Sequence, residues 1–112
     1  MLDRKSFFEK FSIEEEYFKS TGLDWDELVK IHDDYLALVP SLEKVADKFT
    51  FQLIDTKTVH SVRRRVKKPA HLIEKIIRKG KKYVDRNISV ENYKEIVTDL
   101  IGVRVLLTEW TV

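Results

Sequence analysis

Apolar side chains recur every three or four residues through the first half of the chain, which is the spacing of an amphipathic helix. A first set predicts a short helix from Leu2 to about Phe18, and Thr21-Gly22 then indicates a break. A second set predicts a long helix that begins near Asp24, where Glu27 three residues later resembles a capping box. Pro40 lies inside this second helix, so we expect the helix to be kinked or split there.

From Val59 to Lys67 the helical spacing gives way to a two-residue alternation with β-branched valines, which predicts a strand, because neighbouring residues of a strand point to opposite faces. One face carries His60, Val62, Arg64 and Val66, and the other carries Ser61, Arg63, Arg65 and Lys67.

Pro69 then suits the first turn of a helix. The apolar face of that helix would be Leu72, Ile73, Ile76 and Ile77. Gly80 is a suitable stop, and Ser89 is suited to cap a further short helix that runs to about Val97. Residues Leu100–Leu107 are almost continuously apolar, which is typical of a strand buried on both faces.

This order of elements predicts an α/β (α+β) fold in which helices flank a mixed sheet. We expect an N-terminal helical segment over residues 1–56 and a second part over residues 57–112. Two strands are too few for a stable sheet. Either residues around Phe51–Ile54 add a strand, or the sheet is completed by a segment that this chain lacks.

Composition narrows the class of protein. The length of 112 residues suggests one domain, and the absence of cysteine excludes disulfides and thiolate chemistry. The three histidines are too scattered to predict a zinc site. No apolar run approaches the roughly 20 residues that cross a bilayer, and the N-terminus does not resemble a signal peptide. We therefore expect a cytoplasmic protein without a membrane partner.

The net charge of +2 hides a strong segregation of charge. Residues 1–56 have a net charge of −6, residues 57–82 of +10 and residues 83–112 of −2. A basic block of this density requires an anionic ligand or an acidic neighbouring surface.

The basic block contains a pattern suited to polyphosphate. Arg65 and Lys67 project to the same side of the predicted strand, and His71, Lys75 and Arg78 line one stripe of the following helix. The first turn of that helix adds free N–H groups and the positive end of the helix dipole. The same spacing fits a basic surface that is exposed to water and binds no ligand equally well.

A second pattern surrounds the apolar strand. Asp99 lies at its entrance, where a carboxylate needs a cation or a metal, and Mg²⁺ is commonly held by one or two carboxylates plus phosphate oxygens. Arg104 is able to stack on a base. A turn cap or a pair with Arg104 is the more common role for such an aspartate. Asp99 and Arg104 share a ligand only if Asp99 precedes the strand or Gly102 forms a bulge.

Together the two patterns resemble the RelA/SpoT family of (p)ppGpp synthetases. The chain has Arg-x-Lys-x₇-Lys-x₂-Arg from Arg65 to Arg78 and, about twenty residues later, Asp-Leu-Ile-Gly-Val-Arg from Asp99 to Arg104. The resemblance covers about residues 59–107. It implies a nucleotidyltransferase-like fold and transfer of pyrophosphate from ATP to the 3′-hydroxyl of GDP or GTP.

The resemblance also implies roles for individual residues. Arg65, Lys67, Lys75 and Arg78 would hold the ATP phosphates, Asp99 would be the Mg²⁺-binding catalytic aspartate, and Arg104 would pack on the adenine. His71 stands where the family usually has serine. The family's guanine-stacking tyrosine and catalytic glutamate lie downstream of the second motif. We therefore expect a fold incomplete at the C-terminus, which holds the ATP and Mg²⁺ half of the site and is inactive alone.

Other interpretations stay open. A toxin-type relative would act on adenine nucleotides or tRNA. An RNA-binding module would use residues 57–82, although that block lacks the aromatic side chains on which bases stack. A structural or interaction fragment would bind no ligand. We also expect a homo-oligomer that associates near Leu100–Val112, because an apolar strand with open edges pairs readily with another chain.

Overall fold

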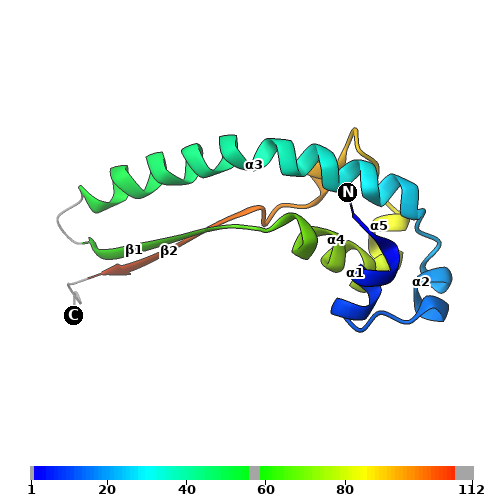
Figure 1. Cartoon of the computed structure of the whole chain (residues 1–112). Helices are drawn as coiled ribbons and strands as arrows, with labels where there is room; N and C mark the ends of the chain where they lie inside the picture. Colours follow the sequence, from blue (N-terminus) through cyan, green and yellow to red (C-terminus); the bar gives the residue numbers. More distant parts are fainter. Residues whose placement is uncertain (1, 56–58, 108–112) are drawn as a thin grey trace. The chain divides into compact units, whose positions relative to one another are not determined.

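The computed structural model describes residues 2–55 and 59–107 and shows an α+β protein in which helices accompany a small antiparallel sheet (Figure 1). The chain forms two compact units. The first, the helical unit, contains Met1–Ala37 and Lys68–Thr98, and the second, the sheet unit, contains Leu38–Lys67 and Asp99–Val112. Glu109 and the last three residues lie outside the described part of the chain.

The helical unit opens with two helices where the sequence predicts one. Helix α1 spans Arg4–Lys10 and α2 spans Glu15–Thr21. The prediction of one helix through Phe18 is therefore wrong, because the backbone of Ser12 adopts a φ of 55° that ends α1. The predicted break at Thr21-Gly22 is confirmed, since Gly22 ends α2 with a φ of 79°, a conformation that glycine adopts without steric cost.

Helix α3, Trp25–Ile54, is longer than predicted and contributes to both units. The Asp24 carboxylate accepts from the Asp26 N–H at its start, whereas the Glu27 carboxylate accepts from the N–H of Val90, so the expected reciprocal capping box is not formed. Pro40 does not split the helix. One missing N–H and a local clash weaken a single turn, and the apolar stripe on either side of Pro40 keeps the helix continuous. The suggestion of strand residues at Phe51–Ile54 is wrong, because they form the last turn of α3.

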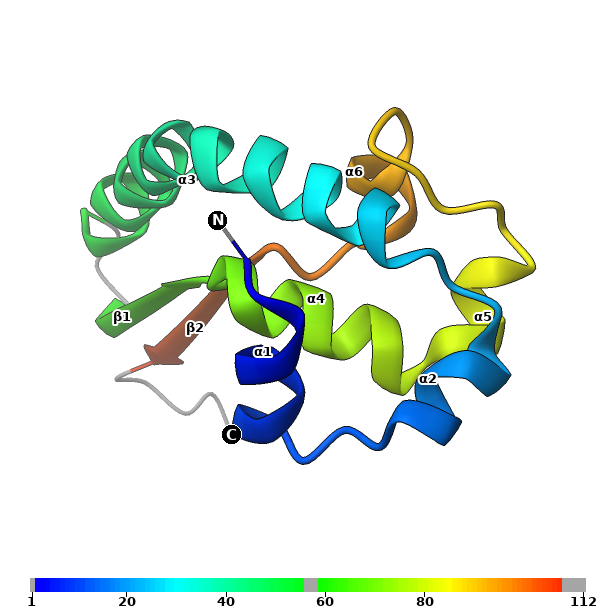
Figure 2. The same ribbon diagram turned by 45° about the vertical axis from the view of Figure 1, so that its right-hand side comes forward.

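The remaining helices of the helical unit follow β1. They are α4 (Pro69–Arg78), α5 (Gly80–Val84) and α6 (Tyr93–Ile96). Pro69 at the first position and the apolar face of α4 are confirmed. Gly80 begins α5 directly after α4 instead of separating helices (Figure 2). Helix α6 is shorter than expected and has Asn92, not Ser89, as its cap.

The core of the helical unit is apolar and aromatic. Helices α1, α3 and α4 each contribute several fully or almost fully buried side chains, and α2, α5 and α6 contribute one aromatic side chain each. These side chains are Phe7, Phe8, Phe18, Leu28, Ile31, Tyr35, Leu72, Ile73, Ile76, Ile77, Tyr83 and Tyr93. Burial of each large side chain contributes roughly 1.5–3 kcal/mol. Trp25 contacts three phenylalanine rings and thereby joins α1, α2 and α3.

The sheet unit contains β1, Val59–Val66, paired antiparallel with β2, Ile101–Leu107. The prediction that β2 is buried on both faces is wrong, since Val103, Val105 and Leu106 are 41%, 38% and 55% exposed. The physical reason is that, in the described part of the chain, β1 is the only strand beside β2. The apolar run correctly predicts a strand, but its cover depends on neighbours that the run does not specify.

Candidate functional site

One face of the two-stranded sheet carries cations from both strands. Arg63 and Arg65 of β1 are two residues apart and share this face, and Lys67 follows in the same alternation. In the antiparallel register Arg63 lies opposite Arg104, and Arg65 lies opposite Gly102. We call Arg63, Arg65, Lys67 and Arg104 the cationic face.

The opposite face neutralises its own arginine. Arg64 pairs with Glu43 and, at 2.9 Å, with Asp47, both from α3 within the sheet unit. The hydrogen bond to Glu43 and the charge of Asp47 raise the pKa of Arg64 above its ordinary value. Arg64 therefore connects α3 to the sheet and does not take part in the cationic face.

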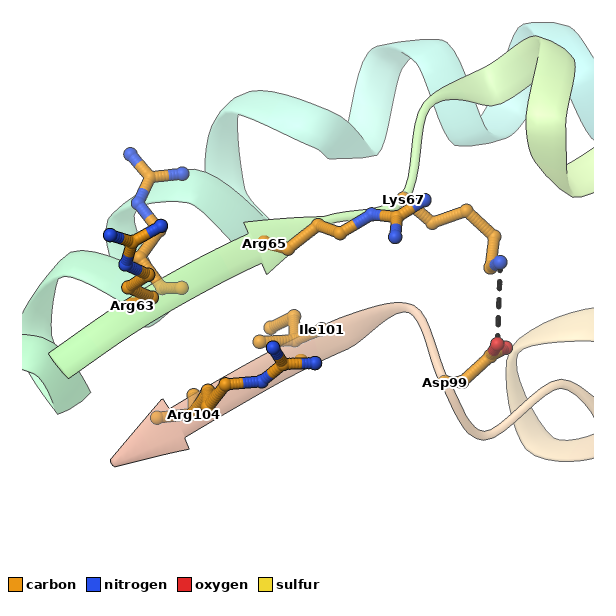
Figure 3. Close-up of a pocket in the computed structure, with 9 residues that line it drawn as sticks. Arg63, Arg65, Lys67, Asp99, Ile101 and Arg104 are labelled. Atoms are coloured by element: carbon orange, nitrogen blue, oxygen red, sulfur yellow. Dashed lines mark ion pairs between the residues drawn. The ribbon is translucent and has the colours of Figure 1, made fainter. Parts of the chain in front are cut away.

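The cationic face borders an open pocket of about 600 Å³. Arg65, Lys67, Asp99 and Arg104 all line it, so the structure places together four of the residues that the two sequence motifs single out (Figure 3). The side chains of Arg65, Lys67 and Arg104 extend toward the end of the pocket where Asp99 lies (Figure 3). This arrangement suits an anion with several charged oxygens.

Asp99 is held at the end of the pocket by the backbone of the strand ends. The N–H of Lys67 donates to the carbonyl of Leu100 at 2.8 Å, which fixes the residue after Asp99 beside Lys67. The Lys67 ammonium then lies 3.3 Å from the Asp99 carboxylate. Asp99 precedes β2, which begins at Ile101, and this resolves the odd spacing between Asp99 and Arg104.

Gly102 contributes open space and not a bulge. The pairing of β1 and β2 is regular at this glycine, and the only register shift lies between Val59 and Ser61. A Cβ atom built on Gly102 would meet nothing within 4 Å. Gly102 lies opposite Arg65 and lines the pocket, so its missing side chain leaves open space in the pocket for a ligand.

The pocket has a strong excess of positive charge. Its lining contains the four cationic side chains of the cationic face and one carboxylate, that of Asp99, while the remaining cation of the lining, Arg64, is paired with Glu43 and Asp47. Within the residues that the structure describes, the guanidinium groups of Arg63, Arg65 and Arg104 have no ion-pair partner. Cations gathered without acidic partners repel one another, so an anion would be bound with a gain in free energy.

A single carboxylate among cations fits a magnesium ion that arrives with a polyphosphate. Mg²⁺ retains waters and commonly takes one or two carboxylates plus phosphate oxygens. Among the described residues there is no cluster of three or more carboxylate or histidine side chains suited to hold a resident ion. Asp99 is about half exposed, so a hydrated ion has access to its oxygens.

The other predicted site residues, His71, Lys75 and Arg78, lie on α4 in the helical unit. The His71 ring packs edge-on against Phe11 with centroids 5.9 Å apart. The Arg78 Nε donates to Glu74 at 2.8 Å. Because these three residues and the cationic face belong to different units, their convergence on one ligand stays a prediction.

Sequence reasoning left two features of the site unassigned. It placed Arg63 on the same face as Arg65 but gave it no function, although the spacing of two residues was a sufficient signal. It also considered Arg104 and not Lys67 as the ion-pair partner of Asp99. The pairing with Lys67 depends on the antiparallel register, which the spacing within either motif does not reveal.

No helix in the described part of the chain is long and apolar enough to span a membrane. Comparison of the chain with protein-family models, with curated proteins and with solved structures finds no match.

Proposed function

We propose that this chain binds ATP with Mg²⁺ as the donor part of a RelA/SpoT-type, nucleotidyltransferase-like synthetase domain in the cytoplasm. The observation that carries the proposal is the pocket of the sheet unit, where Arg65 and Lys67 of one motif meet Asp99 and Arg104 of the other. Twenty residues, 79–98, separate the two motifs, yet side chains from each of them line one cavity whose charge suits a nucleoside triphosphate.

Each residue has a role that follows from its chemistry. Lys67 and Arg65 bind phosphate oxygens, and a guanidinium does so with two parallel hydrogen bonds. Arg104 offers the flat face of its guanidinium to the adenine ring. Mg²⁺ bound to Asp99 and the phosphates would neutralise charge that develops during transfer. In the intact domain the acceptor is the 3′-hydroxyl of GDP or GTP, which attacks the β-phosphorus of ATP and displaces AMP.

The rate of such a transfer comes from positioning and from charge stabilisation. The pocket supplies these two contributions on the donor side. A group that takes the proton of the acceptor hydroxyl is not assigned among the described residues. We therefore expect this chain to bind the donor nucleotide without turnover.

Titration of the chain with a non-hydrolysable ATP analogue tests the proposal. We expect saturable binding that strengthens when Mg²⁺ is added and that exceeds binding of a single-stranded RNA of equal charge. Stronger binding of RNA, with a steep dependence on salt, would contradict the proposal and indicate a nucleic-acid surface instead.

The contribution of α4 is tested by a matched pair of substitutions. Lys75→Ala removes a cation from the motif stripe of α4, and Lys82→Ala removes one from the exposed surface of α5. We expect Lys75→Ala to weaken binding of the analogue far more than Lys82→Ala. Equal effects would show that α4 acts only as a diffuse basic surface.

A further inference from the structure

Arg63 is the cation of the pocket that the proposed function leaves without a role. Its side chain is exposed and lines the pocket, and in the described part of the chain its guanidinium has no ion-pair partner. Arg104 lies directly opposite on β2, and like charges in this position destabilise a sheet. Pairing of the strands does not require this cost, since a neutral polar side chain would suit the same exposed position.

Positive charge dominates this end of the pocket. Arg65 follows Arg63 by two residues on the same face, and Arg104 lies opposite, so three guanidinium groups act together. Asp99, the one carboxylate of the lining, is at the other end of the pocket (Figure 3). On the far side of β1, two acidic side chains of α3 are already paired with Arg64. An anion bound beside Arg63 would therefore be attracted by three cations.

The distance between Arg63 and Lys67 limits what kind of anion can bind there. Strands rise about 3.3 Å per residue, so Arg63 lies roughly 13 Å along the chain from Lys67. A triphosphate bound at Lys67 and Asp99 is shorter than this span, and the Arg63 side chain does not extend toward Asp99 (Figure 3). Between the two ends, Gly102 leaves open space for an uncharged part of the ligand. An anion at Arg63 is therefore a separate group, on the nucleoside side of the triphosphate.

We propose that Arg63 forms a second anion subsite, which binds a phosphate group on the ribose of the nucleotide whose triphosphate lies at Lys67 and Asp99. A guanidinium suits this group because it donates two parallel hydrogen bonds to phosphate oxygens. The bound phosphate would also offset the repulsion between Arg63 and Arg104. Two ligands carry this chemistry, a mononucleotide with an additional ribose phosphate and the 5′-triphosphate end of an RNA. The inference rests on the proposed function, because it takes the triphosphate to be bound at Lys67 and Asp99.

Three ligands test the subsite by titration in the presence of Mg²⁺. They are a non-hydrolysable ATP analogue, the same analogue with a phosphate on its 3′-hydroxyl, and a dinucleotide that begins with the same analogue. We expect the added phosphate to strengthen binding to the unchanged chain about fivefold. A gain with either phosphorylated ligand supports the subsite, and the larger of two gains identifies the source of the phosphate. The absence of a gain with both ligands would overturn the subsite.

Substitution of Arg63 shows where the added phosphate binds. R63Q should abolish the gain and leave affinity for the ATP analogue itself within about twofold, because salt screens charges that are this far apart. Since it removes a like-charge pair, R63Q should also keep or raise the midpoint of thermal unfolding. The matched control is Lys44→Gln, which removes one charge at an exposed position of α3 in the same unit and should keep the gain. A gain that survives in R63Q, or that both variants reduce equally, would contradict the subsite and indicate a diffuse effect of charge.

The ATP analogue without the added phosphate separates this inference from the proposed function. If it binds and the added phosphate brings no gain that depends on Arg63, the subsite is wrong and the proposed function is unaffected. If neither the ATP analogue nor its phosphorylated forms bind, the proposed function and the subsite are both wrong. If only the phosphorylated ligands bind, and R63Q abolishes that binding, the subsite is supported and ATP is not the ligand of the pocket.

Discussion

Asp99 and Lys67 form an ion pair that a nucleotide would have to exchange. Without ligand the Lys67 ammonium and the Asp99 carboxylate lie 3.3 Å apart. A Mg²⁺-polyphosphate offers a new partner to each at once, with phosphate oxygens for Lys67 and the metal for Asp99. Mg²⁺ alone or polyphosphate alone would offer a new partner to only one member of this ion pair. Metal and nucleotide should therefore bind cooperatively.

Asp99→Asn tests this exchange. We expect binding of the ATP analogue to lose its dependence on Mg²⁺, because the amide keeps the shape but not the charge that the metal needs. Thermal unfolding should change little, since an ion pair whose carboxylate is about half exposed contributes only about 0–1 kcal/mol. Isothermal titration with and without Mg²⁺ measures the first effect. If the variant instead unfolds while its folded fraction still responds to Mg²⁺, Asp99 is a structural residue.

At the scale of elements, the sequence predicts best where a pattern is decided locally. The alternation of residues 59–67 identifies both faces of β1, and Pro69 with the apolar face identifies α4. Predictions failed where the hydrogen-bond partner or the burial of a residue depends on a part of the chain that is distant in sequence. Glu27 bonds to Val90, 63 residues away, in place of its own helix start, and β2 is exposed because of what lies beside it. Within the site, the motifs single out candidate residues whose function stays a prediction, and the register decides which of them face each other.

Gly80 is an element junction that tolerates no side chain. A Cβ atom there would lie 2.5 Å and 2.7 Å from the side-chain carbons of Thr21, at the end of α2. Gly80→Ala should therefore lower the free energy of unfolding by about 1–3 kcal/mol, the usual cost of overpacking. Gly102→Ala is the matched control, with nothing within 4 Å, and should cost little. Chemical denaturation measures both, and equal losses would show that Thr21 moves aside.

Tyr93 joins α6 to α3 through a buried ring whose hydroxyl donates to Asp34 at 2.6 Å. Burial raises the pKa of Tyr93 above its ordinary value of 10.0, and the bond to Asp34 raises it further. Because its pKa is higher in the folded chain than in the unfolded chain, Tyr93 contributes its full stabilisation below the unfolded pKa of about 10. This contribution is lost as the pH rises above about 10. Tyr93→Phe should cost about 1 kcal/mol at neutral pH, and above pH 10 its stability should fall less steeply than that of the unchanged chain. Parallel slopes in thermal unfolding from pH 9 to 11 would contradict this.

At the scale of the whole molecule, the exposed surface of β2 is the feature from which we predict self-association. Val103, Val105 and Leu106 are exposed, and in the described residues one edge of β2 has no neighbouring strand. Edge pairing with a second copy would satisfy the open backbone groups of that edge and would place a further strand beside these apolar side chains. Sedimentation velocity over a range of concentrations should show association, and Val103→Lys should reduce it. A monomer at every concentration, with a cooperative thermal transition, would contradict the expectation.

Three consecutive arginines, 63 to 65, make the register of β1 in the sheet poorly defined by its charged residues. If β1 slipped by one residue, arginines would still occupy two of these three pairing positions. The basic residues alone therefore barely distinguish the two registers. Glu43 and Asp47 remove the ambiguity by accepting one arginine from the α3 side of the strand. These ion pairs favour the alignment in which Arg64 faces α3 and Arg63 and Arg65 lie together on the other face of the strand.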